Sequence, residues 1–305
     1  MSLQNSTNNR NYQIECSLNN LLQSGVDISK KKHNGSVLHC QFSKGNGQYC
    51  MSAGADKNIK LLNPYKSFFV LKEYKSHGYE VFDIDISNDN NYFVSASADK
   101  NVFLWDVSTG EVKRRFKEHK GKVNCVKYNF NNEIIMSGSY DRTLKVWDVR
   151  SASYKSVQNL GDFQDSVSSI TSSDSSIIAG CVDGTVHIYD IRMGKLKVDD
   201  LGGASVGHVS ISKNYKTYCC SLLNSTILMI EIESGNILRT LTGHTNEKYQ
   251  IKHTISNDDR YLLSGDENGN IFEWNLENEQ SCKIPKIDSD STPVVSIDYH
   301  PKGKY

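Results

Sequence analysis

The sequence predicts an all-β fold built from a repeated module, and three observations support this prediction. Val, Ile, Thr, Tyr and Phe are abundant, whereas long runs of helix-forming residues are missing. Clusters of Gly, Asn, Asp and Ser punctuate the chain about every ten residues, as expected for short antiparallel strands joined by turns. A segment that ends in Trp-Asp or a related pair recurs at a nearly constant period, which is typical of a repeat architecture.

The clearest copy of the repeat is SYDRTLKVWDVRS, residues 139–151. It places Asp141 in a polar turn, followed by an alternating strand that ends at Trp147-Asp148. The successive spacings between the matching pairs are 43, 42, 42, 41 and 44 residues. The other matching pairs are Leu62-Asn63, Trp105-Asp106, Tyr189-Asp190, Ile230-Glu231 and Trp274-Asn275.

Each repeat also contains an earlier alternating strand, and this element occurs seven times rather than six. Its recurrence predicts seven structural units. The seven segments begin at Val37, Val81, Val123, Val167, Val206, Gln250 and Val294.

A histidine precedes four of these strands by about four to six residues. The first three histidines are followed by a turn Asp after 22 or 23 residues. Two later repeats have Phe163 or Gly202 near the position of the histidine, and two have Asn224 or Asn268 at the turn. The residues of this marker are His33, His77, His119 and His244, with Asp56, Asp99 and Asp141.

Together the histidine, the turn Asp and the Trp-Asp pair resemble the WD-repeat signature over roughly residues 33–305. The resemblance implies a β-propeller whose blades are four-stranded antiparallel sheets around a central channel. The seven first strands then predict seven blades. The seventh would be incomplete, because the chain stops at Tyr305, and we expect the natural protein or gene to extend further.

Ring closure is expected to involve the N-terminal region. The segment GVDISKKKH, residues 25–33, is placed to add a closing strand to the last blade. We therefore expect residues 25–305 to form a single propeller domain. Residues 1–24 are polar and Asn-rich and are expected to be a partly disordered tail. Residues 11–18 also alternate, so a further strand there is the alternative.

In WD-repeat proteins the loop His, a strand Ser, the turn Asp and the Trp indole are linked by hydrogen bonds inside one blade. The resemblance implies such structural sets here, because a buried Trp N–H and a buried Asp need partners. A catalytic Ser/His/Asp site is the alternative, but the same trio recurs in three repeats. The expected sets are His33 and Asp56; His77, Asp99 and Trp105; and His119, Asp141 and Trp147, the last with Ser137 or Ser139.

Charge and composition restrict the function further. Thirty-five basic residues balance thirty-five acidic ones, which disfavours strong direct binding of nucleic acid. None of the eight cysteines forms a C-x-x-C pair, so no zinc site is predicted. Adjacent Cys219 and Cys220 would alternate faces, with one exposed. The sequence shows no apolar signal core and no stretch approaching 18 apolar residues, so we expect no membrane span and a cytoplasmic and nuclear location.

No P-loop, H-E-x-x-H motif or nucleophile elbow occurs, so the sequence predicts no cofactor, no metal, no small-molecule substrate and no enzymatic activity. The segments HGYEVFDIDIS (77–87), HKGKVNCVKYN (119–129) and GHTNEKYQIKHTIS (243–256) resemble the mitogen-activated protein kinase organizer family of WD-repeat proteins. This resemblance implies a scaffold that gathers kinases of a signalling cascade and associates with the pre-mRNA splicing machinery. Such a protein would be a monomer within larger complexes.

Family resemblance also places the binding face. The loop before each first strand and the turn that carries the Asp fall on one face in this family. Tyr and Arg are favoured there, since they bury a large area with a polar tip. The alternative is that these are solvated turn residues. The predicted binding residues are Tyr79, Glu80, Tyr140, Arg142, Lys248 and Tyr249.

An Asp-x-Arg sequence ends two consecutive repeats, with Arg150 in the first and Arg192 in the second. It resembles the box by which some propellers dock on cullin-type ubiquitin ligases as substrate receptors. The same sequence often makes an ion pair inside a blade, so both interpretations stay open. A direct contact with RNA is a further alternative, disfavoured by the neutral charge.

Overall fold

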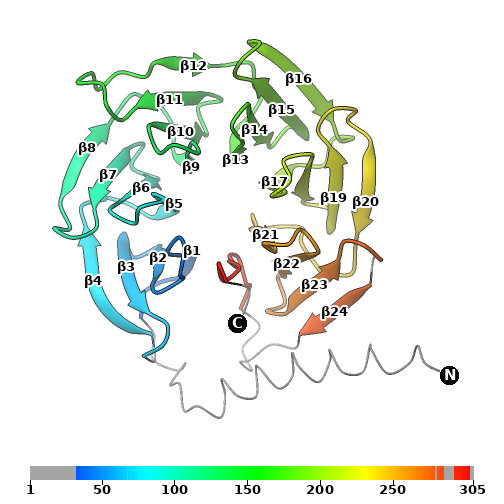
Figure 1. Cartoon of the computed structure of the whole chain (residues 1–305), viewed down its shortest axis with the longest axis horizontal. Helices are drawn as coiled ribbons and strands as arrows, with labels where there is room; N and C mark the ends of the chain where they lie inside the picture. Colours follow the sequence, from blue (N-terminus) through cyan, green and yellow to red (C-terminus); the bar gives the residue numbers. More distant parts are fainter. Residues whose placement is uncertain (1–31, 67, 279, 285–291, 303–305) are drawn as a thin grey trace.

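The computed structural model describes residues 32–66, 68–278, 280–284 and 292–302. These residues form six four-stranded antiparallel sheets, arranged as blades around a central channel (Figure 1). In every blade the strands pair in chain order, with the first strand nearest the channel and the fourth at the outer edge. The fold is therefore all-β, as the repeat pattern predicted.

The first three blades hold strands β1 to β12. Their bounds are β1 Val37–Phe42, β2 Cys50–Gly54, β3 Asn58–Asn63, β4 Phe69–Lys75, β5 Val81–Ile86, β6 Tyr92–Ser97, β7 Val102–Asp106, β8 Val112–Phe116, β9 Val123–Tyr128, β10 Ile134–Ser139, β11 Leu144–Asp148 and β12 Gln158–Leu160.

The next three blades hold strands β13 to β24. Their bounds are β13 Val167–Ser172, β14 Ser176–Cys181, β15 Thr185–Asp190, β16 Lys195–Asp200, β17 Val206–Ile211, β18 Thr217–Leu222, β19 Thr226–Glu231, β20 Ile237–Leu241, β21 His253–Ile255, β22 Tyr261–Gly265, β23 Ile271–Asn275 and β24 Ser281–Ile284.

The hydrophobic core lies between blades rather than inside any one of them. Met51 and Ile59 of blade 1 belong to one buried cluster with Phe93 and Trp105 of blade 2. Corresponding clusters join blades 2 and 3, 3 and 4, 4 and 5, and 5 and 6. Blades 2 to 5 have a neighbouring blade on both faces, so inner strands such as β6 are buried at nearly every position, whereas outer strands such as β4, and β23 of blade 6, alternate.

This double burial explains one wrong expectation. Cys219 and Cys220 do alternate faces of β18, but both are fully buried. Cys219 packs in the cluster between blades 5 and 6, and Cys220 in the cluster between blades 4 and 5. Since neither face of the blade is exposed, alternation does not bring either thiol to the surface.

Polar residues on the innermost strands connect neighbouring blades. Asp83 of β5 accepts a hydrogen bond from the backbone N–H of Val126 in β9, and Asp85 accepts one from Tyr128, both at 2.9 Å. These carboxylates satisfy backbone donors at the edge of the next sheet, which would otherwise be buried without partners. The alternating polar residues of these strands therefore join blades instead of facing solvent.

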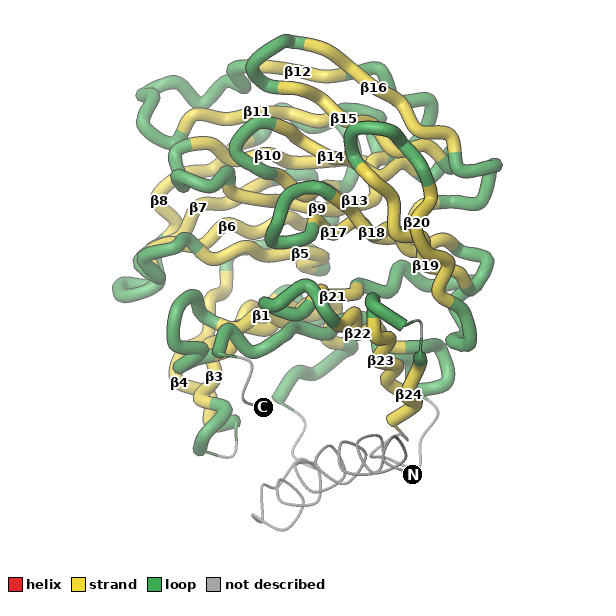
Figure 2. Tube along the Cα trace, turned by 45° about the vertical axis from the view of Figure 1, so that its right-hand side comes forward, coloured by secondary structure: helices red, strands yellow, loops and turns green. Residues whose placement is uncertain are grey.

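The prediction of seven blades is wrong, because the described residues form six four-stranded sheets. The seventh strand-like segment, from Val294, contributes one extended stretch between blades 1 and 6 and belongs to no sheet of its own (Figure 2). Its hydrogen bonds include Val294 N to Asp266 O (3.0 Å), Lys252 N to Val295 O (2.9 Å), Cys40 N to Ser296 Oγ (3.1 Å) and Phe42 N to Asp298 Oδ2 (2.8 Å).

Ser296 and Asp298 explain why the pattern was counted as a further blade. They repeat the spacing of Asp83 and Asp85 and likewise accept backbone N–H groups of the neighbouring innermost strand. A segment can thus carry an inner-strand pattern without building a sheet. The predicted tail at 1–24, including the alternative strand at 11–18, lies outside the described residues, as does nearly all of the closing strand at 25–33. Within the described part of the chain, no helix is long and apolar enough to cross a membrane.

Replacing Phe93 by Ala tests the location of the core. Phe93 is fully buried between blades 1 and 2, where its ring stacks on Trp105 at 5.6 Å between centroids. We expect Phe93→Ala to lower the free energy of unfolding by about 3–5 kcal/mol. Phe69→Ala, on the exposed outer strand, should change it by less than about 0.5 kcal/mol. Urea unfolding monitored by circular dichroism measures both, and equal effects would contradict a core between blades.

Candidate protein-interaction surfaces

One hydrogen-bonded set of four side chains fixes the turn of blade 3. The Trp147 indole N–H donates to Ser137 Oγ at 2.8 Å. Ser137 Oγ lies 2.8 Å from His119 Nε2, and His119 Nδ1 lies 3.0 Å from Asp141 Oδ2. Of the two serines considered from the sequence, Ser137 therefore makes the contact, and Ser139 instead donates to the carbonyl of Lys122.

The order of donors in this set follows from its ends. The indole can only donate and the carboxylate can only accept, so Ser137 donates to His119 Nε2 and His119 Nδ1–H donates to Asp141. Burial raises the pKa of Asp141, but the hydrogen bonds from His119 and Thr143 outweigh it and hold this pKa well below its usual range. The set thus keeps a charged turn residue at the edge of the core.

Blades 1 and 2 contain equivalent sets. His33 Nδ1 lies 2.9 Å from Asp56, and Leu62 stands where blades 2, 3 and 6 have Trp. In blade 2, His77 Nδ1 lies 2.7 Å from Asp99, and the indole of Trp105 donates to the same serine as His77 contacts. Each set is confined to one blade, so the three sets do not share a cleft.

Blade 6 has the histidine and the tryptophan but not the linked set. Asn268 stands at the turn position, and both ring nitrogens of His244 are buried without a hydrogen-bond partner among the described residues. Trp274 donates instead to the carbonyl of Thr242 at 3.0 Å. Blade 4 has Phe163 in place of the histidine, and its ring lies 4.4 Å from that of His187.

The residue after the turn Asp adopts a left-handed backbone conformation. Blades 4 and 6 place Gly there, at Gly184 and Gly269, as the conformation favours. Blades 1 to 3 place Lys57, Lys100 and Arg142 there, with φ of 68°, 69° and 64°. A non-glycine residue in this region costs roughly 1–2 kcal/mol, so three blades retain a basic side chain at an energetic cost.

The predicted binding residues of blades 2 and 3 lie on one face. Tyr140 N donates to Lys122 O at 2.9 Å, which joins the turn of blade 3 to the loop before its first strand. The carbonyl of Glu80 accepts the corresponding bond in blade 2. Tyr79 and Tyr140 are 60% and 66% exposed. We call the exposed side chains of Tyr79, Lys100, Tyr140 and Arg142 the turn face.

Lys248 and Tyr249 lie in the loop before the first strand of blade 6 and line the cavity of the channel. The Glu267 carboxylate accepts three consecutive backbone N–H groups, from Glu247, Lys248 and Tyr249, at 2.5–3.1 Å. These bonds outweigh the effect of burial and lower the pKa of Glu267. They fix the loop while the side chain of Tyr249 stays 48% exposed.

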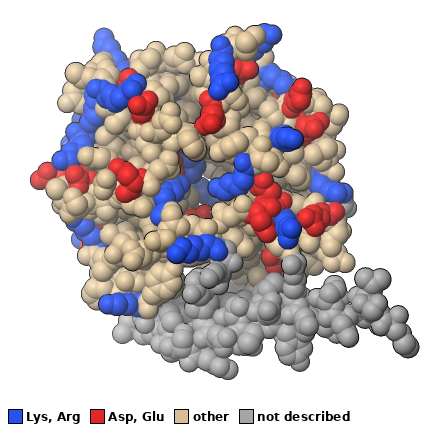
Figure 3. All heavy atoms as spheres, viewed as in Figure 1, with Lys and Arg blue, Asp and Glu red and all other residues tan. Residues whose placement is uncertain are grey.

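Charged side chains cross the central channel. Lys252 of blade 6 extends to blade 2, where its ammonium lies 2.6 Å from Asp83 Oδ1 and donates to the carbonyl of Phe82 at 3.1 Å. Lys127 and Lys44 lie 3.5 and 3.6 Å from Asp85. Figure 3 shows basic side chains around the central opening. A cavity of about 250 Å³ remains beside Lys252 and Asp83.

Three strand histidines lie at or near the channel, of which His39 and His253 are buried and His208 is half-buried. His39 and His208 line the cavity, and His208 Nδ1 lies 3.4 Å from Nδ1 of His253. In the described residues, no group of three or more His, Cys, Asp or Glu is placed to hold a metal ion. Burial lowers the pKa of all three histidines, to about 3 for His253, so they are neutral at pH 7.

Ser296, His39 and Asp83 are close enough to suggest a catalytic triad, but their geometry does not make one. Ser296 Oγ lies 3.2 Å from His39 Nδ1. The distance from His39 Nε2 to Asp83 is 3.5 Å, and Nε2 has no hydrogen-bond partner among the described residues. Asp83 is already bound to Lys252 and to a backbone N–H, so it does not orient the imidazole.

The two arginines of the Asp-x-Arg sequences differ in their surroundings. Arg150 is exposed and pairs inside its blade, at 2.8 Å from Glu133 and 3.5 Å from Asp148. Arg192 is also exposed and lines a groove between blades 3 and 4. Arg150 is therefore already paired inside its blade, whereas Arg192 lies at the groove, so the two arginines do not offer a partner the same contact.

Sequence reasoning missed the cross-channel lysine and this groove. Lys252 lies in an unremarkable segment of blade 6, and its partner Asp83 is 169 residues away. The groove arises where the outer strand β12 is only three residues long. The 42-residue spacing around blade 3 is regular, so a short outer strand left no sign in the period.

Comparison with known proteins identifies what the chain resembles. The family model for the WD domain, G-beta repeat, matches residues 68–106, 110–148, 154–190 and 235–275. WD repeat domain-containing protein 83 of Homo sapiens is 39% identical over 88% of this chain and 83% of its own length. The WD repeat domain-containing protein 83 homolog of Dictyostelium discoideum is 30% identical over 88% and 90%. Pre-mRNA-processing factor 17 of Saccharomyces cerevisiae is 23% identical over 86% and 59%.

A pair of identical substitutions tests the hydrogen-bonded sets. His119→Phe removes the partner of Ser137 and Asp141, and we expect it to lower the free energy of unfolding by about 1–3 kcal/mol. His244→Phe removes two buried ring nitrogens that have no hydrogen-bond partner in the described part of the chain, so it should be neutral or stabilising. Phe163 shows that blade 4 accommodates this ring at the same position. Urea unfolding compares them, and an equal loss from both would contradict the assignment.

Stability should fall in mild acid because of the channel histidines. Their pKa is lowered in the folded state, so the unfolded chain binds more protons below about pH 6.5. Stability is then fully present above pH 6.5 and is lost as the pH falls toward 3, by up to about 1.4 kcal/mol per pH unit for each histidine. The urea midpoint at pH 7.5 and 5.5 measures this slope. His253→Gln should flatten it, and an unchanged slope in that variant would refute the explanation.

Proposed function

Because this chain belongs to the WD-repeat family, we propose that it is a non-enzymatic scaffold that holds partner proteins on the turn face of blades 2 and 3. The six blades that the described residues form supply a rigid disc, and rigid elements position binding residues with little cost in ordering. The partners proposed are kinases of a mitogen-activated cascade and proteins of pre-mRNA splicing, met in the cytoplasm and the nucleus.

The observation that carries this proposal is the pair of basic residues in left-handed turns beside exposed tyrosines. Lys100 and Arg142 occupy positions where Gly stands in blades 4 and 6. Backbone strain that persists where a better residue is available points to a functional use of the side chain. Tyr79 and Tyr140 flank these turns, and Tyr with Arg is the composition of binding hot spots.

Relatives support the partner classes. The similarity to WD repeat domain-containing protein 83 extends over most of both chains, and the segments that resemble kinase organizers lie within it. The similarity to Pre-mRNA-processing factor 17 supports the splicing class. Docking on a cullin-type ligase stays a second hypothesis without specific support, because Arg150 is already paired with Glu133.

Glycine substitutions give a test in which stability and binding move in opposite directions. Lys100→Gly with Arg142→Gly removes both basic side chains and relieves the backbone, so we expect stability to rise by about 1 kcal/mol per site and partner recovery to drop at least fivefold. Ser225→Gly is the matched control, because Ser225 holds the same turn position in blade 5 with φ of 63°. It should be equally stabilised and keep its partners.

Affinity purification from the native cell with mass spectrometry measures partner recovery and identifies the class. Recovery of kinases or splicing proteins that depends on Lys100 and Arg142 supports the proposal. Full recovery with the double glycine variant would remove the turn face as the binding site. A ligase adaptor lost on Arg150→Ala with Arg192→Ala would favour the second hypothesis instead.

A further inference from the structure

The outer strands of blades 1, 2, 4 and 5 carry a basic residue that connects the blade to the next one. At one fixed register position, this residue reaches backbone carbonyls in the turn that follows the third strand of the neighbouring blade. We call these residues the outer-strand clamps. They are Lys72 opposite Leu61, Arg114 opposite Leu104, Lys197 opposite Ile188 and Arg239 opposite Met229.

The carbonyls that accept these bonds are also equivalent from blade to blade. Each carbonyl lies two or three residues after the tryptophan of the third strand, or after the residue that replaces this tryptophan. The contacts are Lys72 to Val107 O (3.3 Å), Arg114 to Val149 O (2.7 Å), Lys197 to Ile232 O (2.8 Å) and Arg239 to Glu277 O (3.2 Å).

The junction of blades 3 and 4 is the exception. The register places Gln158 opposite Val146, where blades 1, 2, 4 and 5 have Lys or Arg and blade 6, the last blade, has Cys282. Gln158 is exposed, and no side chain of the described residues donates to the carbonyls of Ile191 and Arg192, which hold the equivalent turn positions. The carbonyl equivalent to that of Ile191 is bound by a clamp at the junctions of blades 1 and 2, 2 and 3, and 4 and 5, whereas here it has no side-chain donor among the described residues.

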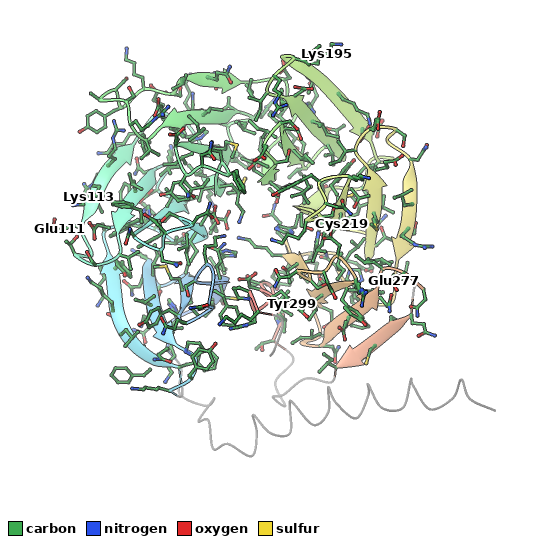
Figure 4. The ribbon with its side chains drawn as sticks, in the orientation of Figure 1. Glu111, Lys113, Lys195, Cys219, Glu277 and Tyr299 are labelled. Carbon is green, nitrogen blue, oxygen red and sulfur yellow. The ribbon has the colours of Figure 1, made fainter. Side chains whose placement is uncertain are left out.

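A groove of about 730 Å³ lies at this junction. Its apolar wall is made by Met136, Val146 and Leu160 of blade 3 and by Ile177 of blade 4. Figure 1 shows short β12 and long β16 as neighbours at the outer edge of the ring, and Figure 4 places Lys195 at this outer edge. The volume is within the range of ligand pockets and admits more than one side chain.

The rim of the groove is unusually apolar for a surface. Phe130 and Val157 of blade 3 are 58% and 62% exposed, and Ile191 of blade 4 is 53% exposed. All three line the groove. Contiguous exposed apolar residues around a hollow mark sites where another chain binds.

We propose that this groove binds a segment of a partner protein that inserts an apolar side chain and a neighbouring Lys or Arg. The apolar side chain packs on Met136 and Ile177, and the basic group donates to the carbonyls of Ile191 and Arg192. The partner thus supplies the clamp that Gln158 does not. This surface is distinct from the turn face, and the inference does not rest on the proposed function.

Charge around the groove is compatible with a basic occupant. Asp174 and Asp190 line it and balance the positive charge of Arg192 and Lys195. At the previous junction, Arg114 binds the carbonyl of Val149 although Arg150 follows directly in the chain. An arginine next to the acceptor turn therefore does not exclude a second cation.

The test uses a peptide with the sequence of residues 111–118, EVKRRFKE, which contains the clamp Arg114 and the apolar Phe116 of this chain. The peptide is acetylated, amidated and labelled with a fluorophore, and its binding to the full chain is measured by anisotropy. A second peptide carries Gln at the position of Arg114, as in β12. A third carries Glu at the positions of both arginines.

We expect the first peptide to bind with a micromolar dissociation constant and the Gln peptide at least tenfold more weakly. Gln158→Arg in the protein should raise the melting temperature by completing the clamp and weaken peptide binding at least tenfold. Gln164→Arg, the same change at an exposed loop position of blade 4, is the control and should leave both unchanged. Equal binding of the first two peptides, preference for the Glu peptide, or no binding at 1 mM would each overturn the proposal.

Discussion

Burial of sheet faces between neighbouring blades is the constraint on which this ring depends. A four-stranded sheet has two faces, and each blade can cover them only by packing on a neighbour at either side. The clusters accordingly combine residues of consecutive blades, such as Met51 with Trp105. The requirement also determines composition, because inner strands such as Cys50–Gly54 are buried at every position, whereas the outer strands return to alternation.

Close packing of sheets leaves backbone groups to be satisfied at the channel, and charged side chains fulfil this need. Asp83 and Asp85 accept N–H groups of the next blade, and Lys252 crosses from blade 6 to balance Asp83. A buried ion pair costs desolvation and adds little net stability, but breaking it leaves an uncompensated charge. The polar centre of the ring is therefore explained by structure, and its serine, histidine and aspartate need no catalytic role.

The sequence predicted what depends on local pattern. The repeat period and the His, Asp and Trp markers located the blades and the linked sets of blades 1 to 3, because these contacts recur within 24 residues. The number of blades was wrong because residues 294–298 carry the inner-strand pattern without a sheet. The roles of Gln158 and Lys252 could not be predicted from the sequence. The role of Gln158 depends on the register of β12, and that of Lys252 depends on a partner 169 residues away.

Repetition makes the molecule its own reference for finding function. Where one blade has a different residue at an equivalent position, the other blades show which residue and contact would be more stable there. Arg142 has a positive φ at the turn position where blade 4 has Gly184, which adopts this conformation without strain. Gln158 does not make the bond to the next blade that Arg114 makes. Both departures sacrifice stability that the fold offers, at positions exposed to solvent. Packing among the residues that the structure describes gives no reason for either, so a binding partner is the physical explanation to test for both.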